Sequence, residues 1–506
     1  MFKVTNNMMK KRLLIANRSE IAIRIIRSAH KMGMYAVVFR SDKEPDALYL
    51  KFADEIIDAK DADDEKPIFL NQHKIVELAV EHNIDLIHPG YGFLSENPDF
   101  AALCIANNIN FIGPSPELIR DMGLKTVAKK MAIEAGLPLV PGSDGPVATA
   151  KDAKDFADKI GYPVILKASA GGGGRGMRIV EKAETIERNF KSAYDEALSA
   201  FGNGDIFIEK YLQNPKHLEF QILGDKHGNV IHLGERECSL QRKHQKIIEE
   251  APSASVTSEM RDEMGSLAVK FAQKIGYYSA GTIEFIMDED GSYYFMEMNT
   301  RIQVEHPITE MITGVDLVDW QIKIALNEKL TLKQDDIKIN GWAIECRVNT
   351  EDPQNRFSPQ TGFIDKIKFP QGSNVRLETG FLSGSIVTPY FDSMIAKIIV
   401  HGNDRNSTIR ETLKALSDFN IIGLKTTVPF CVAVLKHPDF INATYTTRWV
   451  DKVYTPEMLE NEDDEMIGAL AATILYASEY LQLQGDIPAY ENDALNVWVL
   501  NKRLNY

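Results

Sequence analysis

The N-terminal third of the chain alternates short apolar runs with amphipathic segments, and this alternation constrains the fold more than any other feature. Residues 12–16 and 35–39 are typical of buried strands, and further strand patterns cover 84–87 and 110–112. Between the first two, residues 20–32 carry apolar side chains at helical spacing. Strands that are separated by helices pair in parallel, so we expect an α/β unit with a parallel sheet.

The length and charge of the chain limit the classes of protein to which it can belong. Its 506 residues suffice for about three domains. Its 57 Lys and Arg against 72 Asp and Glu give a net charge of −15, which argues against binding to nucleic acid or an anionic membrane. The four cysteines form no CxxC pair, as in a reducing compartment. Without a signal peptide or a bilayer-length apolar stretch, we expect a cytoplasmic protein.

A run of four glycines at 171–174 separates two predicted strands, which cover 163–167 and the residues from Met177 onward. Glycines leave backbone N–H groups unobstructed, so such a loop can wrap around phosphate oxygens, with Lys167 and Arg175 adding positive charge. The pattern is neither a Walker loop nor a GxGxxG motif, and glycine runs are often plain hairpin tips. The flanking basic residues favour phosphate binding.

A predicted hairpin brings two acids and an amide together. Residues 281–287 and 293–298 have strand character and are joined by a short turn. Glu297 and Asn299 lie on one face of their strand, and Glu284 faces them if the two strands pair. Such oxygen ligands suit Mg²⁺ or Mn²⁺ that bridges nucleotide phosphates. The alternative is three exposed polar residues on one sheet face.

The segment directly after the hairpin places Arg301, Gln303 and Glu305 at alternate positions. Beside a metal site, these residues could bind a small anion and deprotonate it, with Glu305 as general base. His306 precedes Pro307 near a predicted helix start, so we expect a structural role for it.

Other basic residues, Lys125, Lys246 and Arg347, are isolated in the sequence. Isolated basic residues are usually solvated, so only an external reason would assign these to a site. Cys238 precedes the basic cluster at 242–246, but no His-Cys-Asp constellation accompanies it, and we expect a packing cysteine.

Taken in order, the motifs resemble the biotin carboxylases of the ATP-grasp superfamily, the ATP-using components of acetyl-CoA, propionyl-CoA and pyruvate carboxylases. The resemblance runs from residue 11 to about residue 455, and the ordered set is far more specific than any one string. The strings are ANRSEIA at 16–22, HPGYGFLSEN at 88–97, IGP at 112–114, KASAGGGGRGM at 167–177, EKYL at 209–212, RKHQK at 242–246, FMEMNTRIQVEHP at 295–307, ECRVNTEDP at 345–353 and YFDSM at 390–394. One departure is Ser19, where the family often has glycine.

The resemblance implies an α/β and α+β protein with the ATP-grasp fold. A flavodoxin-like or Rossmann-like N-terminal (pre-ATP-grasp) domain would cover 10–124, followed by the ATP-grasp domain at 125–330. A mobile glycine-rich lid would span about 141–212. The C-terminal biotin carboxylase domain would cover 340–450. The tail at 456–506 exceeds the compact form of the family. A helix is expected there with an apolar face of Ile467, Leu470, Ala471 and Ile474, and this face, rather than the resemblance, suggests a subunit-docking segment.

The resemblance also implies roles for individual residues. Those expected to bind ATP are Lys125, Lys167, Gly173, Gly174, Glu209, Lys210, Tyr211, Leu212, His217 and His244. Those expected to hold two divalent ions, Mg²⁺ or Mn²⁺, are Glu284, Glu297 and Asn299. Because the ions would bridge the phosphates, Glu284 and Glu297 are also counted among the residues expected to bind the nucleotide. Those expected to bind bicarbonate are Lys246, Arg301, Gln303, Val304 and Glu305, whereas Arg347 would face the ureido oxygen of biotin.

In the implied reaction, bicarbonate loses its proton to Glu305 and attacks the γ-phosphate of ATP while Lys246 and Arg301 hold the anion. The resulting carboxyphosphate is short-lived in water, so the lid must close. The resemblance implies that carboxyphosphate then splits into phosphate and CO₂. The released phosphate deprotonates biotin N1′, which attacks CO₂ while Arg347 stabilises the enolate-like ureido oxygen.

The partners follow from the resemblance and from what the sequence omits. No Met-Lys-Met biotinylation motif occurs, so we expect biotin on a separate biotin carboxyl carrier protein. The resemblance further implies a homodimer and a separate carboxyltransferase subunit. The final acceptor, whether acetyl-CoA (as in fatty acid biosynthesis), propionyl-CoA, pyruvate or another, stays open.

Two other functions remain open. Another ATP-grasp ligase with an amine acceptor would share the chemistry, as carbamoyl-phosphate synthetases do. Their duplicated halves are absent here, and the strings at 345–347 and 390–392 favour biotin. A nucleotide-binding regulatory protein with an inactive site is a different class, against which the intact set of charged residues argues.

Overall fold

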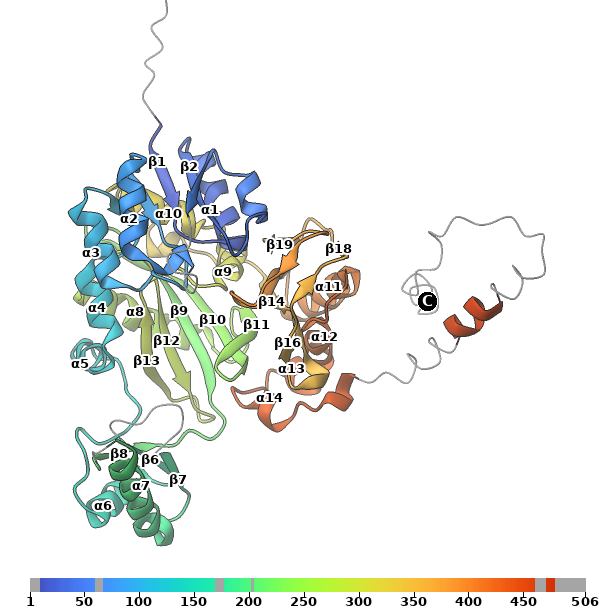
Figure 1. The fold of residues 1–506 in the computed structure, drawn as a ribbon. Coiled ribbons are helices and arrows are strands. Elements are labelled where there is room, and N and C mark those ends of the chain that lie inside the picture. Colours follow the sequence, from blue (N-terminus) through green and yellow to red (C-terminus); the bar gives the residue numbers. More distant parts are fainter. Residues whose placement is uncertain (1–9, 60–66, 169–176, 202–203, 460–469, 478–506) are drawn as a thin grey trace, which may run out of the picture.

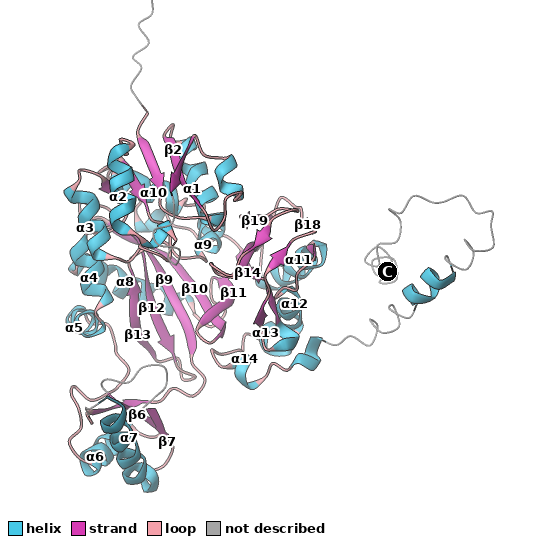
Figure 2. Cartoon of the chain, in the orientation of Figure 1, coloured by secondary structure: helices cyan, strands magenta, loops and turns pink. Residues whose placement is uncertain are grey.

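The computed structural model describes residues 10–59, 67–168, 177–201, 204–459 and 470–477 (Figure 1). Figure 2 shows a strand-rich centre, with a helix-covered N-terminal part at the top of the view and a small separate body at the bottom. The small body carries the two strands that flank the glycine run.

The N-terminal residues form the parallel sheet that the alternation predicts. Its order is β3-β2-β1-β4-β5, and all neighbouring strands are parallel. From β1 at the centre, the strand order proceeds through β2 to β3 on one side and through β4 to β5 on the other, as in doubly wound folds. The strands are β1 (Arg12–Ile15), β2 (Tyr35–Ser41), β3 (Glu55–Ala59), β4 (Leu86–His88) and β5 (Asn110–Phe111). The helices are α1 (Ser19–Lys31), η1 (Leu48–Lys51), η2 (Ile68–Leu70), α2 (Gln72–Glu81), α3 (Pro98–Ala106) and α4 (Pro116–Gly123).

The turn between β1 and α1 accounts for the departure at Ser19. This residue has a φ of 58°, in the left-handed region that glycine adopts without steric cost. A side chain here carries backbone strain, which is a physical reason for the glycine that the resemblance implies at this position.

The small body has a three-stranded antiparallel sheet of order β7-β6-β8, covered by two helices. Its elements are α6 (Ala150–Ile160), β6 (Val164–Ala168), β7 (Met177–Val180), η3 (Ala183–Thr185), α7 (Ile186–Phe201) and β8 (Ile206–Lys210). Glu209 and Lys210 therefore lie on the same sheet as Lys167. Gly173 and Gly174 lie outside the described residues.

The centre of the molecule is an eight-stranded sheet of order β13-β12-β9-β10-β11-β14-β21-β19. Because β11 pairs with β14, this sheet runs without a break from the predicted ATP-grasp region into the predicted C-terminal region. Its strands are β9 (Lys216–Gly224), β10 (Val230–Arg242), β11 (Gln245–Ala251), β12 (Ser279–Met287), β13 (Tyr293–Asn299), β14 (Trp342–Asn349), β19 (Val375–Thr379) and β21 (Met394–Gly402). Helices of this region are α5 (Lys125–Ala135), α8 (Ser258–Lys274), α9 (His306–Thr313) and α10 (Leu317–Ala325), with the turn η4 (Gln334–Asp336).

The C-terminal part adds short strand pairs and four helices to the edge of the large sheet. The strands are β15 (Glu351–Asp352), β16 (Ser358–Pro359), β17 (Gly362–Phe363), β18 (Lys366–Lys368), β20 (Ile386–Val387) and β22 (Asn420–Ile422). The helices are α11 (Arg405–Asp418), α12 (Val428–Lys436), α13 (Pro438–Ile441) and α14 (Trp449–Lys452), with the turns η5 (Pro353–Asn355) and η6 (Pro456–Leu459).

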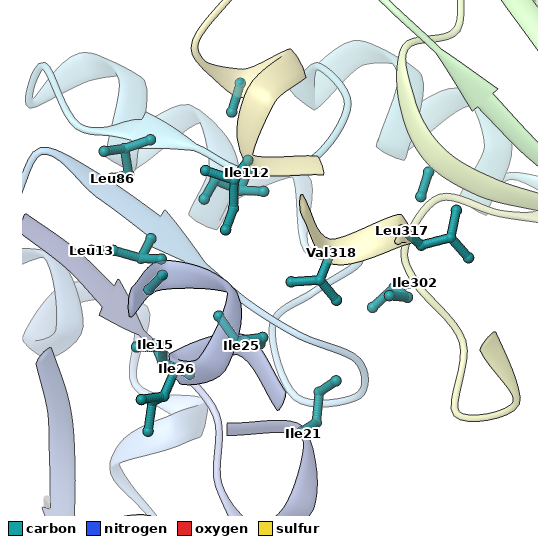
Figure 3. Close-up of a cluster of buried hydrophobic side chains, with 14 of the residues drawn as sticks. Leu13, Ile15, Ile21, Ile25, Ile26, Leu86, Ile112, Ile302, Leu317 and Val318 are labelled. Carbon is teal, nitrogen blue, oxygen red and sulfur yellow. The ribbon is translucent and has the colours of Figure 1, made fainter. Parts of the chain in front are cut away.

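One buried apolar cluster joins the N-terminal sheet to the segment that follows β13. Ile21 and Ile25 of α1 lie in the same cluster as Val318 of α10 and Ile302 (Figure 3). All four side chains are buried. The segment carrying the predicted anion-binding residues is thus held against the N-terminal sheet by apolar packing.

No helix among the described ranges is both long and apolar enough to span a bilayer. In the tail, residues 470–477 are helical, in line with the helix expected there, although Ile467, which was expected on its apolar face, lies outside the described part. All four cysteines are buried and free of disulfide bonds.

Candidate functional site

The hairpin of β12 and β13 forms as predicted, and it places the two acids face to face. The strands are antiparallel with Glu284 opposite Glu297. The Asn299 side-chain amide donates a hydrogen bond of 2.9 Å to Glu284. The three predicted metal ligands therefore lie together on one patch of the large sheet.

The two acids of this patch differ in charge environment. Burial raises the pKa of Glu297, and the nearby Glu284 carboxylate raises it further. Burial also acts on Glu284, but Lys246 and His217 outweigh it and hold its pKa well below the ordinary value. A divalent cation between the two carboxylates would relieve their repulsion, and hard oxygen ligands suit such an ion. The residues present therefore fit Mg²⁺ or Mn²⁺.

A second group of potential ligands lies beside the first. His217, Glu219 and Glu284 bring ligand atoms within 4.8 Å of one another. However, the Lys246 ammonium already donates to Glu219 at 2.5 Å and to Glu284 at 3.2 Å. Because this cation neutralises the second group, the side of Glu284 that faces Glu297 fits a metal ion better.

Glu305 is buried and lies between two half-buried cations. Lys246 donates to one carboxylate oxygen at 2.7 Å, and Arg347 donates to the other at 2.9 Å. Burial disfavours the charged form of Glu305, but Lys246, Arg347 and Arg236 hold its pKa well below the ordinary value. The carboxylate is therefore ionised and able to accept a proton.

Arg347 comes from β14, and its second partner is Glu249 of β11. The guanidinium donates to Glu249 at 2.6 Å. Burial raises the pKa of Glu249 to about 7, with Arg347 opposing and Glu305 adding to the rise. This strand pair thus carries a carboxyl group that titrates near neutral pH, in contact with the cation predicted to face biotin.

The remaining anion-binding residues follow β13. Arg301 donates to Glu96 at 2.8 Å and to Asn299 at 3.0 Å, which directs it toward the metal ligands. The Val304 carbonyl accepts a hydrogen bond of 2.7 Å from Lys397, a fully buried lysine of β21. All five residues predicted to bind bicarbonate therefore lie in one segment or in contact with it.

The residues predicted to bind ATP are spread over the small body and the rim of the large sheet. Glu209 pairs with Lys167 and with Lys129, the latter at 3.4 Å. Lys125 begins α5 and is exposed, and its charge lowers the pKa of Glu297.

The hinge segment lies between the small body and the large sheet. Lys210 donates to the carbonyls of residues 161–162 at 3.1 Å each. Leu212 is buried, and Tyr211 borders a cavity of about 640 Å³ between the small body and α14. His244 lies exposed in the turn between β10 and β11, apart from this segment.

Five residues of the site were not found from the sequence: Glu96, Glu219, Arg236, Glu249 and Lys397. The strand 216–224 does carry a signal, because polar residues alternate at His217, Glu219 and Gln221 within an otherwise apolar run. All three are buried, so the alternation marks a polar face inside the molecule. His306 and Cys238 are buried as expected, and the Cys238 thiol lies 4.0 Å from Glu305.

Family models cover nearly all of the described chain. The biotin carboxylase N-terminal domain matches residues 9–119, the carbamoyl-phosphate synthase L chain ATP-binding domain matches 125–333, and the biotin carboxylase C-terminal domain matches 345–452.

Three curated relatives match over almost their full length. The 2-oxoglutarate carboxylase small subunit of Hydrogenobacter thermophilus is 49% identical over 92% of this chain and 99% of its own. A pyruvate carboxylase subunit of Methanothermobacter thermautotrophicus is 45% identical over 95% of this chain and 98% of its own. Biotin carboxylase 1 of Bacillus subtilis is 48% identical over 88% of this chain and 98% of its own.

A solved structure agrees with these relatives. It is the biotin carboxylase domain dimer of the H. thermophilus 2-oxoglutarate carboxylase, in complex with MgADP, ADP and bicarbonate. Its sequence is 50% identical to this chain, and the match covers 89% of this chain and 99% of the solved chain, with a TM-score of 0.78. The matches to all three family models and the high identity over nearly whole chains show that this protein belongs to the biotin carboxylase family of the ATP-grasp superfamily.

Proposed function

We propose that this chain catalyses the ATP-dependent carboxylation of biotin on a separate carrier protein, with bicarbonate as the carboxyl donor. The observation that carries the proposal is the position of Glu305 between Lys246 and Arg347. Those two cations are the ones predicted to contact bicarbonate and biotin, so the proposed base lies where the two substrates would meet. Carboxybiotin, ADP and phosphate are the products.

The ion pairs around Glu305 suggest how the base would be switched on. With Lys246 and Arg347 attached, its pKa is low and its carboxylate is a weak base. Bicarbonate would draw Lys246 away from the carboxylate, and the ureido oxygen of biotin would draw Arg347 away. Removing either cation raises the pKa of a buried carboxylate, so substrate binding would strengthen the base at the moment it is needed.

The chain's own residues would hold the reactants in line. Lys246 and Arg301 neutralise the bicarbonate anion, whereas Lys125 and Lys167 approach the nucleotide phosphates. Mg²⁺ or Mn²⁺ held by Glu284, Glu297 and Asn299 would neutralise phosphate charge. Supporting this set, the H. thermophilus domain is described with MgADP and bicarbonate bound. We also infer a homodimer, because that domain is described as a dimer.

Steady-state ATP hydrolysis tests the proposal. We expect hydrolysis to require sodium bicarbonate and a divalent cation, and to rise when free biotin or a biotinylated carrier domain is added. Hydrolysis that proceeds equally well without bicarbonate and ignores biotin would contradict the assignment. Product analysis with labelled bicarbonate should find acid-labile label on biotin.

We further propose that the final acceptor is a 2-oxo acid, because the tail is shared with subunits of 2-oxo acid carboxylases. The family models end at residue 452. The alignment with the M. thermautotrophicus pyruvate carboxylase subunit covers 95% of this chain, about 481 of its 506 residues, so it must include part of the tail. The alignment with the 2-oxoglutarate carboxylase small subunit covers 92%, about 466 residues, so it extends into the tail too. The 88% shared with biotin carboxylase 1, about 445 residues, requires no such extension. Purifying the chain with its native carboxyltransferase and comparing pyruvate, 2-oxoglutarate and acetyl-CoA as acceptors tests this.

A further inference from the structure

Arg236 is a fully buried arginine that no motif singled out. It lies on β10, and its side chain has no exposed surface. Burying a guanidinium costs free energy unless its N–H donors are hydrogen-bonded, so its hydrogen-bond partners indicate its role. Those partners come from strands β9 and β12, from α9 and from the segment after β13.

One edge of the guanidinium donates to Gln303, a residue proposed to bind bicarbonate. The Nη2 group donates to the Gln303 side-chain oxygen at 2.5 Å and to Thr282 at 3.2 Å. Because arginine can only donate, the Gln303 carboxamide must turn its oxygen to Arg236 and its nitrogen away. That nitrogen donates to Glu284 at 2.9 Å. Arg236 therefore fixes which end of the amide faces the site.

A second edge reaches Lys246 through Glu219. The Arg236 Nε donates to one oxygen of Glu219 at 2.5 Å, and Lys246 donates to the other oxygen at 2.5 Å. Glu219 thus joins the two cations, and its own position depends on both. A displaced Glu219 would move the Lys246 ammonium relative to Glu305.

The remaining donor anchors the guanidinium away from the site. Its Nη1 group donates to Gln221 at 2.7 Å and to Thr309 at 2.9 Å. Neither side chain contacts Lys246 or Glu305 in the described hydrogen bonds and ion pairs. The planar fork of arginine has five N–H donors for these five acceptors, two more than a lysine ammonium has.

We propose that Arg236 is a positioning residue for bicarbonate: it orients the Gln303 amide directly and the Lys246 ammonium through Glu219. The inference rests on the proposed function, since it concerns the site of the bicarbonate reaction. It assigns Arg236 no contact with substrate. Its effect is expected in the use of bicarbonate and much less in the use of ATP.

The test compares Arg236→Lys with the matched control Thr309→Val in bicarbonate-dependent ATP hydrolysis. We expect Arg236→Lys to raise the KM for bicarbonate tenfold or more while the KM for ATP stays within twofold. Thr309→Val removes one anchoring bond on the far side, so both KM values should stay within twofold of wild type even if the melting temperature falls. Unchanged KM values in Arg236→Lys, or equal increases for both substrates, would overturn the proposal.

A second variant keeps the test decisive if Arg236→Lys does not fold. Glu219→Gln keeps one oxygen for Arg236 but removes the negative charge that joins it to Lys246, and Glu219 itself is assigned no contact with bicarbonate. A KM for bicarbonate within twofold of wild type would show that the contact is unimportant and overturn the proposal; a tenfold increase supports it. If the wild-type protein hydrolyses ATP without needing bicarbonate, the proposed function fails. If wild type needs bicarbonate but the variants have a wild-type KM for it, only the role of Arg236 fails.

Discussion

Lys246 donates a hydrogen bond of 2.7 Å to Glu305, a carboxylate with only 2% of its side chain exposed. A buried carboxylate that keeps its charge through such a contact is ready to take a proton once the cation moves to a substrate. Glu305→Gln preserves the shape of the side chain but cannot accept that proton, and it keeps only one oxygen for the two cations. We expect kcat to fall about 10²–10⁴-fold, the usual contribution of a general base.

The control for this prediction is ATP itself. Glu305 has no described contact with the residues proposed to bind the nucleotide phosphates, so the KM for ATP should stay within threefold. Equal losses in kcat and ATP affinity would instead indicate a folding or binding defect.

Arg347 should separate the two halves of the reaction. Its guanidinium holds Glu249 and Glu305 together and is proposed to face biotin. In Arg347→Lys the charge remains but the fork is lost, so stimulation of ATP hydrolysis by biotin should fall at least tenfold. The slower bicarbonate-dependent hydrolysis measured without biotin should change less than threefold. A variant that loses both activities to the same extent would contradict a role confined to biotin.

Glu249 gives the molecule a predictable dependence of stability on pH. Its pKa is raised from 4.5 to about 7 by burial, so its neutral form is the one favoured by folding. The stability that it contributes is fully present below pH 4.5 and is lost as pH rises through about 7. Between pH 5 and 8, wild type should lose about 1–3 kcal/mol of unfolding free energy through this group. Glu249→Gln should lack that loss.

Urea denaturation of both proteins at pH 5 and pH 8 measures the difference. Thr412→Val serves as a control, since Thr412 is buried in α11 and donates to the carbonyl of Thr408, and neither residue has a described hydrogen bond to Glu249. It should lower stability equally at both pH values. A Glu249→Gln variant with the same pH dependence as wild type would show that Glu249 is ionised throughout.

The parts of the site that were predictable are those that local sequence encodes. Glu297 and Asn299 share a face because side chains alternate along a strand, and Glu284 reaches them because a short turn fixes the register of the hairpin. The N-terminal parallel sheet follows in the same way from the alternation of strands and helices. Resemblance to a family supplied Lys246 and Arg347, which have no local signal of their own.

The parts that were missed depend on contacts between distant segments. Glu219 reaches Lys246 across the sheet, and Lys397 reaches Val304 from a strand 93 residues further along. Arg236 is indistinguishable in sequence from a surface arginine in an acidic stretch. Only strand order shows that it is buried, since β10 lies between β9 and β11 inside the large sheet.

Glu297 should control the affinity for the divalent cation. Without a metal its pKa is raised by burial and by Glu284, so a bound ion relieves an unfavourable charge. Glu297→Gln should raise the Mg²⁺ concentration for half-maximal activity at least tenfold, and should weaken Mn²⁺ binding measured by electron paramagnetic resonance in the presence of ADP. The matched control is Glu263→Gln, which removes an exposed acid that accepts a hydrogen bond from Tyr293 of the same hairpin. A Glu297→Gln protein that binds Mn²⁺ like this control would exclude Glu297 as a ligand.

The tail is proposed to dock a partner subunit, and its removal tests this directly. The segment 460–465 is strongly acidic, and the helical residues 470–477 expose Leu470 at 45% of its surface. Deleting residues 456–506 removes these features and leaves the three family-matched regions intact. We therefore expect biotin-stimulated ATP hydrolysis with free biotin to stay within twofold of wild type, whereas co-purification with the carrier and carboxyltransferase falls at least tenfold. Leu470→Asp in the full chain is the milder test, because it places a charge on the exposed apolar surface without shortening the chain. Undiminished co-purification of the truncated chain would rule out docking through the tail.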